Sequence, residues 1–238
     1  MTLRSLALLF AASSLAASAR AQTPGDADTA MTAAAMESMS RPMTADPHMR
    51  MTESRSTAPG DSARAVTLIA TVRLDLVKYR NVDSALADGF RPFHPEIRQP
   101  VYHYTNLGNA LEARMTFDPA HPTSLLYRKN ADGTFTLTGV MYTAPRRLTM
   151  DQLDQRVPLS ITHWHEHTNW CVPPAGARER WLERKDGVPV FGPHSAIATK
   201  EGCDAVGGRF LPRIFNWMVH VNAFASDDPA VIWSGDHH

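Results

Sequence analysis

Thr162-His-Trp-His-Glu-His-Thr-Asn-Trp-Cys171 places three of the chain's 11 histidines at alternate positions. Side chains of a β-strand point alternately to the two faces of a sheet, so the pattern predicts a strand with His163, His165 and His167 on one face. Imidazole nitrogen is the commonest protein ligand of late transition metals. The stretch therefore predicts a strand within residues 159–170 and a metal site on one side of it.

The length of a strand limits how many of these histidines one ion can bind. His163 and His167 would lie roughly 13 Å apart at a rise of about 3.3 Å per residue. Two metal–nitrogen bonds of about 2 Å do not span that distance. One ion would therefore bind His165 together with either His163 or His167, which makes His165 the central ligand.

Two histidines outside this strand are predicted to complete the metal site. His220 lies in the predicted last strand, and His103 lies between two tyrosines in another short strand. His94 lies in a predicted loop, where a neighbouring carboxylate could orient its ring. His121 and His194 stand beside prolines in predicted surface loops, and we expect them to lie outside the site. For each of these single histidines the alternative is a hydrogen-bonded structural role.

Hydrophobic periodicity and turn residues predict an α+β domain. A helix is expected to begin at Asp61 or Ser62 and to continue or restart over residues 81–89. Asn130-Ala-Asp-Gly133 is typical of a hairpin turn. The other predicted elements are strands at 101–105, 125–128, 135–142, 159–170 and 216–224, and short helices at 149–155 and 199–206. Together they predict a mostly antiparallel sheet with an N-terminal helix packed on it.

The N-terminal residues have the pattern of a secretory signal peptide. Arg4 precedes an apolar run from Leu6 to Leu15, and Ala19-Arg-Ala21 supplies a cleavage signal. The apolar run is too short to span a bilayer, which takes about 20 residues. We therefore expect residues 1–21 to be removed, no membrane span, and a mature protein that is periplasmic or secreted.

Residues 22–60 are rich in Ala, Thr, Ser, Met and Asp, and they predict a disordered tail ahead of a single globular domain at 61–235. Removing this tail is expected to leave the thermal midpoint nearly unchanged. Six of the 11 methionines fall in it: Met31, Met36, Met39, Met43, Met49 and Met51. Thioethers select Cu(I), so the tail either captures copper or is a linker without function.

Charge and cysteine content exclude some partners and suggest a covalent link. Lys+Arg 24 against Asp+Glu 24 gives no net charge, so no basic face is expected to bind nucleic acid. Cys171 and Cys203 are the only cysteines, and in an oxidising compartment they are expected to form a disulfide. The alternative is that Cys171 binds the metal as a thiolate.

Several motifs resemble those of a family of uncharacterised secreted bacterial proteins. The motifs lie between residues 62 and 233: His103-Tyr-Thr-Asn, Pro122-Thr-Ser-Leu-Leu-Tyr, Gly139-Val-Met-Tyr-Thr-Ala-Pro, Arg156-Val-Pro-Leu-Ser, His163-Trp-His-Glu-His-Thr-Asn and Trp217-Met-Val-His. The resemblance implies a shared fold and export, and it carries no activity.

The sequence thus predicts a protein that binds zinc or copper through His163, His165, His167, His220 and His103. Such a protein could store, carry or sense the metal, or it could be a hydrolase or lyase in which an open coordination position activates water. The third alternative is a structural or partner-binding domain without a metal. No catalytic residue is identified, and Glu166 is expected to be a surface carboxylate because it alternates with the histidines.

Overall fold

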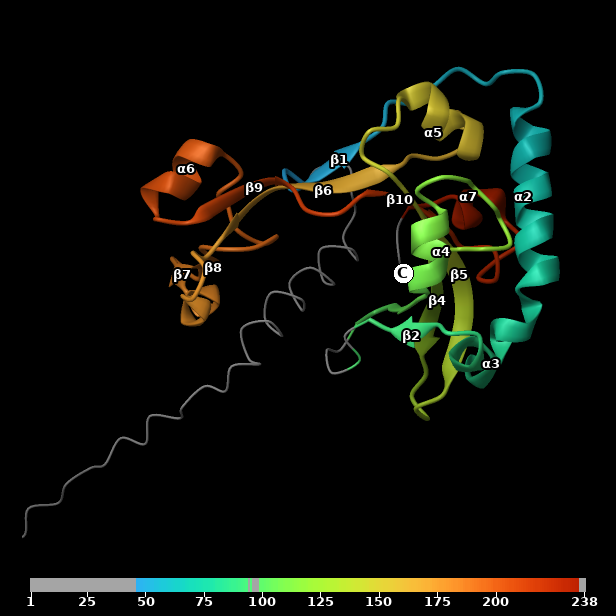
Figure 1. Cartoon of the computed structure of the whole chain (residues 1–238), viewed down its shortest axis with the longest axis horizontal. Coiled ribbons are helices and arrows are strands. Elements are labelled where there is room, and N and C mark those ends of the chain that lie inside the picture. The colour runs from blue at the N-terminus through green and yellow to red at the C-terminus, as the bar shows by residue number, and fades with distance from the viewer. Residues whose placement is uncertain (1–45, 94, 96–98, 236–238) are drawn as a thin grey trace, which may run out of the picture.

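The computed structural model describes residues 46–93, 95 and 99–235. They form a mixed α and β fold with an eight-stranded sheet in which every recorded strand pair is antiparallel (Figure 1). The strand order is β1-β6-β10-β5-β4-β3-β2, and β9 lies off this order and pairs with the second half of β6. The strands of the sheet are β1 (Met49–Met51), β2 (Arg91–Pro92), β3 (Tyr102–Thr105), β4 (Ser124–Lys129), β5 (Phe135–Ala144), β6 (His165–Val172), β9 (Arg209–Arg213) and β10 (Trp217–Val221).

The predicted hairpin forms the centre of the sheet. β4 and β5 pair across the predicted turn, in which Gly133 has a positive φ of 85°. Gly139 on β5 lies against the backbone of Val221 and Asn222, so closely that a Cβ atom there would collide with it. A glycine is therefore required where β5 and β10 meet.

The helices include those that the sequence predicts and two that it does not. The bounds are α2 (Asp61–Asp75), α3 (Val82–Ala87), α4 (Leu107–Glu112), α5 (Met150–Arg156), α6 (Lys200–Ala205) and α7 (Pro229–Ile232). Asn81 caps α3, and Thr149 forms a capping box with Gln152 on α5. α4 and α7 were not predicted. In the described ranges, no helix is both long enough and apolar enough to cross a membrane.

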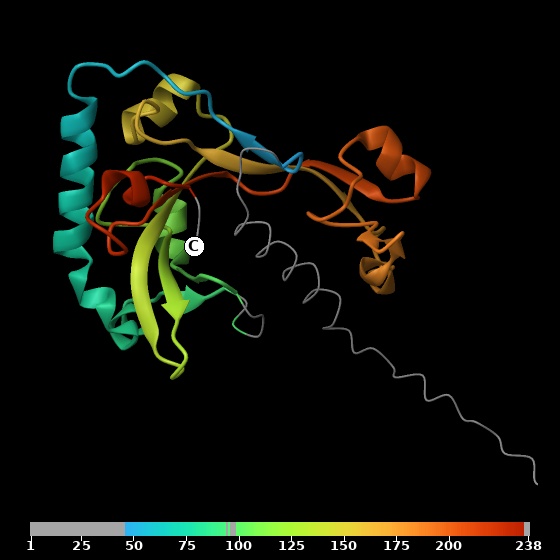
Figure 2. The ribbon, with the colours of Figure 1, turned by 180° about the vertical axis from the view of Figure 1, so that it is seen from behind.

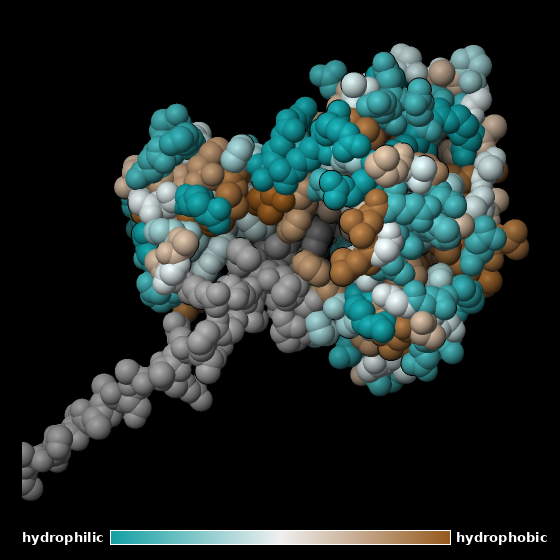
Figure 3. Space-filling model, in the orientation of Figure 1, coloured by the Kyte–Doolittle hydropathy of each residue, from teal (hydrophilic) through white to brown (hydrophobic). Residues whose placement is uncertain are grey.

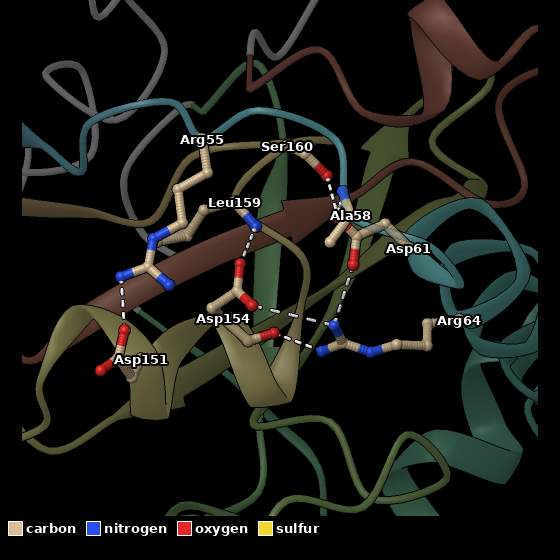
Figure 4. Close-up of polar contacts among 8 residues, drawn as sticks. All are labelled: Arg55, Ala58, Asp61, Arg64, Asp151, Asp154, Leu159 and Ser160. Atoms are coloured by element: carbon tan, nitrogen blue, oxygen red, sulfur yellow. Dashed lines mark hydrogen bonds and ion pairs between the residues drawn. The ribbon is translucent and has the colours of Figure 1, made fainter.

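The start of α2 differs from the prediction. Gly60, with φ 94°, is the N-cap residue in place of Asp61 or Ser62. The Asp61 carboxylate accepts hydrogen bonds from Ala58 N (2.8 Å) and Ser160 Oγ (2.7 Å), as Figure 4 shows. These hydrogen bonds lower the pKa of Asp61. Asp61 therefore fastens the helix start to the loop before β6, and a glycine takes the left-handed conformation next to it.

The predicted tail at 22–60 extends too far, because β1 lies within it. Met49–Met51 pairs with β6, with Met49 opposite His167 and Met51 opposite His165. The amide of Thr52 also donates to Trp164 O at 2.8 Å. A short segment of low β-propensity becomes a strand here because β6 offers an open edge for backbone hydrogen bonding.

The sheet has one face covered by the main hydrophobic core. Ala65, Leu68 and Val72 of α2 belong to one buried cluster with sheet residues such as Leu125 and Val140. Figures 1 and 2 show α2 running along this part of the sheet. The opposite face carries a separate, smaller apolar cluster of Val101, Leu126, Met141 and Met218. The predicted metal-site residues lie on this second face.

β6 and β9 extend away from the main core and carry a small second lobe, visible at the end opposite α2 in Figures 1 and 2. This lobe contains α6 and the hairpin β7 (Arg184–Lys185) and β8 (Val188–Pro189). The disulfide between Cys171 on β6 and Cys203 on α6 is present, which confirms the prediction. Because its sulfur is bonded to Cys203, Cys171 is not a thiolate metal ligand.

Candidate metal centre

Four histidines of the predicted site form a chain of buried rings. The ring centroids are 5.9 Å apart for His103 and His220, 4.9 Å for His220 and His165, and 6.1 Å for His165 and His167. Each of the four side chains is at most 4% exposed. Two imidazoles that bind one ion at about 2 Å have ring centres about 5 Å apart. Of these pairs, His220 and His165 have that spacing. Within the described part of the chain, no three of these histidines bring one ring nitrogen each within 4.8 Å of one another, so the cluster offers ligands in pairs.

Strand register brings these histidines together from distant parts of the sequence. β10 pairs with β6 so that Met218 lies opposite His165, which places His220 on the same face. β10 also pairs with β5, and this puts Met141 opposite His220. β3 reaches the same face two strands further on, with His103 opposite Leu126.

Burial keeps two imidazoles of this cluster in the neutral form that binds metal ions. It lowers the pKa of His103 to about 4, and it lowers the pKa of His167 to about 4 as well. Both rings are therefore neutral at neutral pH, so each has a nitrogen lone pair to offer. An ion would need to displace almost no protons from these two residues.

His163 does not join the other histidines. It precedes β6, which begins at His165, so the alternation of a strand does not extend to it. Its Nδ1 lies 2.8 Å from Thr52 O and its Nε2 lies 3.2 Å from Ser54 Oγ. Residues 52–54 run beside His163 and bind its ring through both nitrogens, so its recorded partners are not the four clustered histidines.

Four methionines lie opposite histidines of the cluster in the strand register. Met141 and Met218 are buried and lie opposite His220 and His165. Met49 and Met51 of β1 are paired with His167 and His165, so they share the face of these histidines. Thioethers are soft ligands that favour Cu(I). The face thus combines imidazole nitrogen with thioether sulfur.

Glu166 is not the surface carboxylate that the sequence predicts. Its side chain is 0% exposed, and its Oε1 lies 3.0 Å from Arg50 Nη1 and 3.4 Å from Arg213 Nε. These arginines come from β1 and β9, two strands that pair with opposite edges of β6. Glu166 projects away from the histidines, as alternation requires, but both arginines cover it.

His48 is a buried histidine that the sequence suggested only as part of a copper-binding tail. Its Nδ1 lies 3.0 Å from Asn169 O and its Nε2 lies 2.8 Å from Ser195 O. Carbonyl oxygens only accept, so a protonated ring makes both hydrogen bonds and a neutral ring makes one. His48 therefore joins the start of β1 to both β6 and the second lobe. Its place in a low-complexity segment gave no signal of this role.

A second set of possible ligands lies at the surface. One ligand atom each from Glu112, Asp118 and His121 lies within 4.8 Å of the other two. His121 Nδ1 is 3.0 Å from Glu112 Oε2 and 3.6 Å from Asp118 Oδ2. The prediction placed His121 outside any site, and only the loop after α4 brings the two carboxylates to it. All three side chains are more than two-fifths exposed, and they already pair with one another.

No family model, curated protein or solved structure matches the chain. The resemblance to a family of secreted bacterial proteins therefore stays a prediction. The predicted signal peptide, most of the predicted tail, and His94 lie outside the described residues.

Proposed function

We propose that the protein binds a transition metal, copper or zinc, on the face of the sheet that carries His103, His165, His167 and His220. The observation that carries this proposal is the chain of four buried rings with centroids 4.9–6.1 Å apart. All four residues are at most 4% exposed, and each imidazole can offer one ring nitrogen to an ion.

The methionines favour copper over zinc within this proposal. Zinc sites in proteins are built from nitrogen, oxygen and thiolate ligands. Met141 and Met218 place thioethers beside the cluster instead, and such a mixture of imidazole and thioether suits copper. Export to the periplasm or beyond, which the N-terminal sequence predicts, is compatible with the disulfide. We propose storage or transport of copper as the role that fits these ligands.

His165→Ala tests the proposal, because His165 lies between two of the other rings. We expect this variant to bind zinc and copper at least about tenfold more weakly than the parent in calorimetric titration. His163→Ala is the matched control: it changes a histidine in the same motif whose ring lies against Thr52 and Ser54, and it should bind as the parent does.

Two results would overturn the assignment. If the parent binds neither metal more tightly than about 10 μM, the cluster is structural. If His165→Ala binds as the parent does and His121→Ala does not, the ion occupies the exposed Glu112, Asp118 and His121 group instead. The thermal midpoint of each variant shows whether it has kept its fold.

A metal-dependent hydrolase or lyase is the second candidate function. A cavity that opens beside His103 favours it, since a catalytic metal needs space for a substrate at an open coordination position.

A further inference from the structure

The face that carries the histidine cluster also contains a cavity of about 430 Å³. It is lined mainly by apolar side chains from β5, β10, α4 and the loops beside them: Pro92, Phe93, Leu107, Ala110, Met141, Phe215 and Met218. Figure 3 shows hydrophobic residues gathered near the middle of this side of the molecule. The volume lies in the range of small-molecule sites, and it would hold about one or two aromatic rings.

Few polar side chains line the cavity, and the charged one among the described residues is positive. Among the described residues that line it, Arg91 is the single ion, and no carboxylate is present. Arg91 lies opposite Thr105 in the β2–β3 pair. Its Nη1 donates to Leu86 O at 2.6 Å and Phe90 O at 2.8 Å, which fixes one end of the guanidinium against the backbone just before β2. A guanidinium at the rim of an apolar cavity complements an anionic group.

The other polar groups in the lining are neutral, and some are paired with one another. The hydroxyls of Thr123 and Thr143 are 2.8 Å apart, and that of Thr105 is 2.9 Å from Ser124 Oγ. These hydroxyl groups hydrogen-bond to one another, so this part of the lining suits an apolar group of a ligand. The apolar lining and the single cation together favour a ligand that is mostly apolar and carries one negative charge.

We propose that this cavity binds a small, mostly apolar molecule with one carboxylate, whose apolar part lies between Phe215 and Met218 and whose carboxylate faces Arg91. Binding in the cavity does not require the metal, so this inference goes beyond the proposed function. His103 belongs to both the cavity lining and the histidine cluster. A ligand in the cavity would therefore lie next to the proposed metal.

The test compares 2-naphthoate with 2-naphthylmethanol, a neutral molecule of the same shape, by ligand-observed NMR on metal-free full-length mature protein. Chelator is present because a carboxylate would otherwise bind the metal directly. We expect 2-naphthoate to bind about tenfold more tightly than the alcohol. Arg91→Gln should remove that difference by weakening naphthoate alone, since a charge-assisted hydrogen bond supplies a factor of this size.

A second pair of variants tests where the ligand sits. Ala110→Phe fills the cavity from α4 and should abolish binding of both molecules. Leu111→Phe is the matched control: it enlarges the next residue of the same helix, which is 63% exposed and is not part of the lining. Unchanged binding in Ala110→Phe, equal affinity of the two ligands, or no binding to the parent would each overturn the proposal.

Metal titration of the same proteins separates this inference from the proposed function. Arg91→Gln should bind metal as the parent does, and His165→Ala should bind naphthoate as the parent does, because His165 is not part of the cavity lining. Loss of metal binding with retained naphthoate binding contradicts the proposed function alone. If the parent binds metal but does not bind naphthoate, the cavity assignment alone is contradicted.

Discussion

Glu166 shows how much a single side chain can depend on elements far from it in sequence. It is fully buried, yet both of its arginine partners are partly exposed, with 47% of the Arg50 side chain and 41% of the Arg213 side chain accessible. Arg50 also lies over the ring of Trp217, 5.2 Å from its centroid. The carboxylate therefore links β1, β6 and β9 at one point.

Glu166→Gln is expected to lower the free energy of unfolding by about 1–3 kcal/mol, because it keeps the shape and removes charge-assisted hydrogen bonds at a buried site. Urea unfolding measures the change. Asp151→Asn is the matched control, since the Arg55–Asp151 pair has a 78% exposed carboxylate and should contribute less than about 1 kcal/mol. Equal losses in the two variants would show that Glu166 is no more important than a surface ion pair.

At the scale of elements, β1 and the chain that follows it tie the N-terminal part of the described residues to the rest of the protein. The β1–β6 pairing, the His48 hydrogen bonds and the bond from Thr168 N to His48 O at 2.8 Å hold the start of this segment. Further on, Arg55 donates to Asp151 at 2.7 Å, as Figure 4 shows. The segment therefore belongs to the folded domain.

A chain that begins at residue 61 should unfold at a thermal midpoint at least about 5 °C below that of a chain that begins at residue 46. Each hydrogen bond lost contributes about 1 kcal/mol, and 1 kcal/mol shifts the midpoint by about 2–4 °C in a protein of this size. Differential scanning calorimetry on both proteins measures the shift. Equal midpoints would restore the original boundary at residue 60 and would mean that β1 adds no stability.

At the scale of the whole molecule, the main sheet and the second lobe have separate hydrophobic clusters. Cys171, Cys203 and Phe191 form the buried centre of the lobe, separate from the core under α2. A Cβ atom on Gly208 would lie 2.5 Å from one disulfide sulfur and 2.7 Å from the other, so the backbone packs directly on the disulfide. A neighbouring cluster, Trp170 and Val172 packed against Trp181 and Leu211, lies where β6 and β9 enter the lobe.

Replacing both cysteines by alanine should therefore loosen the second lobe and leave the histidine cluster in place. The disulfide joins residues 32 apart in the sequence, and chain-entropy estimates for such a loop give about 3–4 kcal/mol. Hydrogen exchange should show faster exchange in residues 181–210 and unchanged protection in β4, β5 and β10. Uniform loss of protection across the main sheet would mean that the two parts unfold as one unit.

The elements predicted from sequence are those whose signals are local. The Asn130–Gly133 turn and the short helices predicted at 81–89 and 149–155 depend on hydrogen bonds within a few residues, and each appears where it was expected. Alternation of side chains along a strand also placed His165 and His167 on one face, as the structure has them. The disulfide followed from the number of cysteines and the expected compartment.

Tertiary structure alone decided which histidines meet. The ring of His163 binds residues 52–54 instead of the other histidines. His103 lies on the face of the cluster because β3 pairs with β4 and β4 pairs with β5. Glu166 is buried because β1 and β9 each supply an arginine. These outcomes depend on pairing between strands that are distant in sequence, and register between distant strands is set by how whole faces pack, which no local pattern specifies.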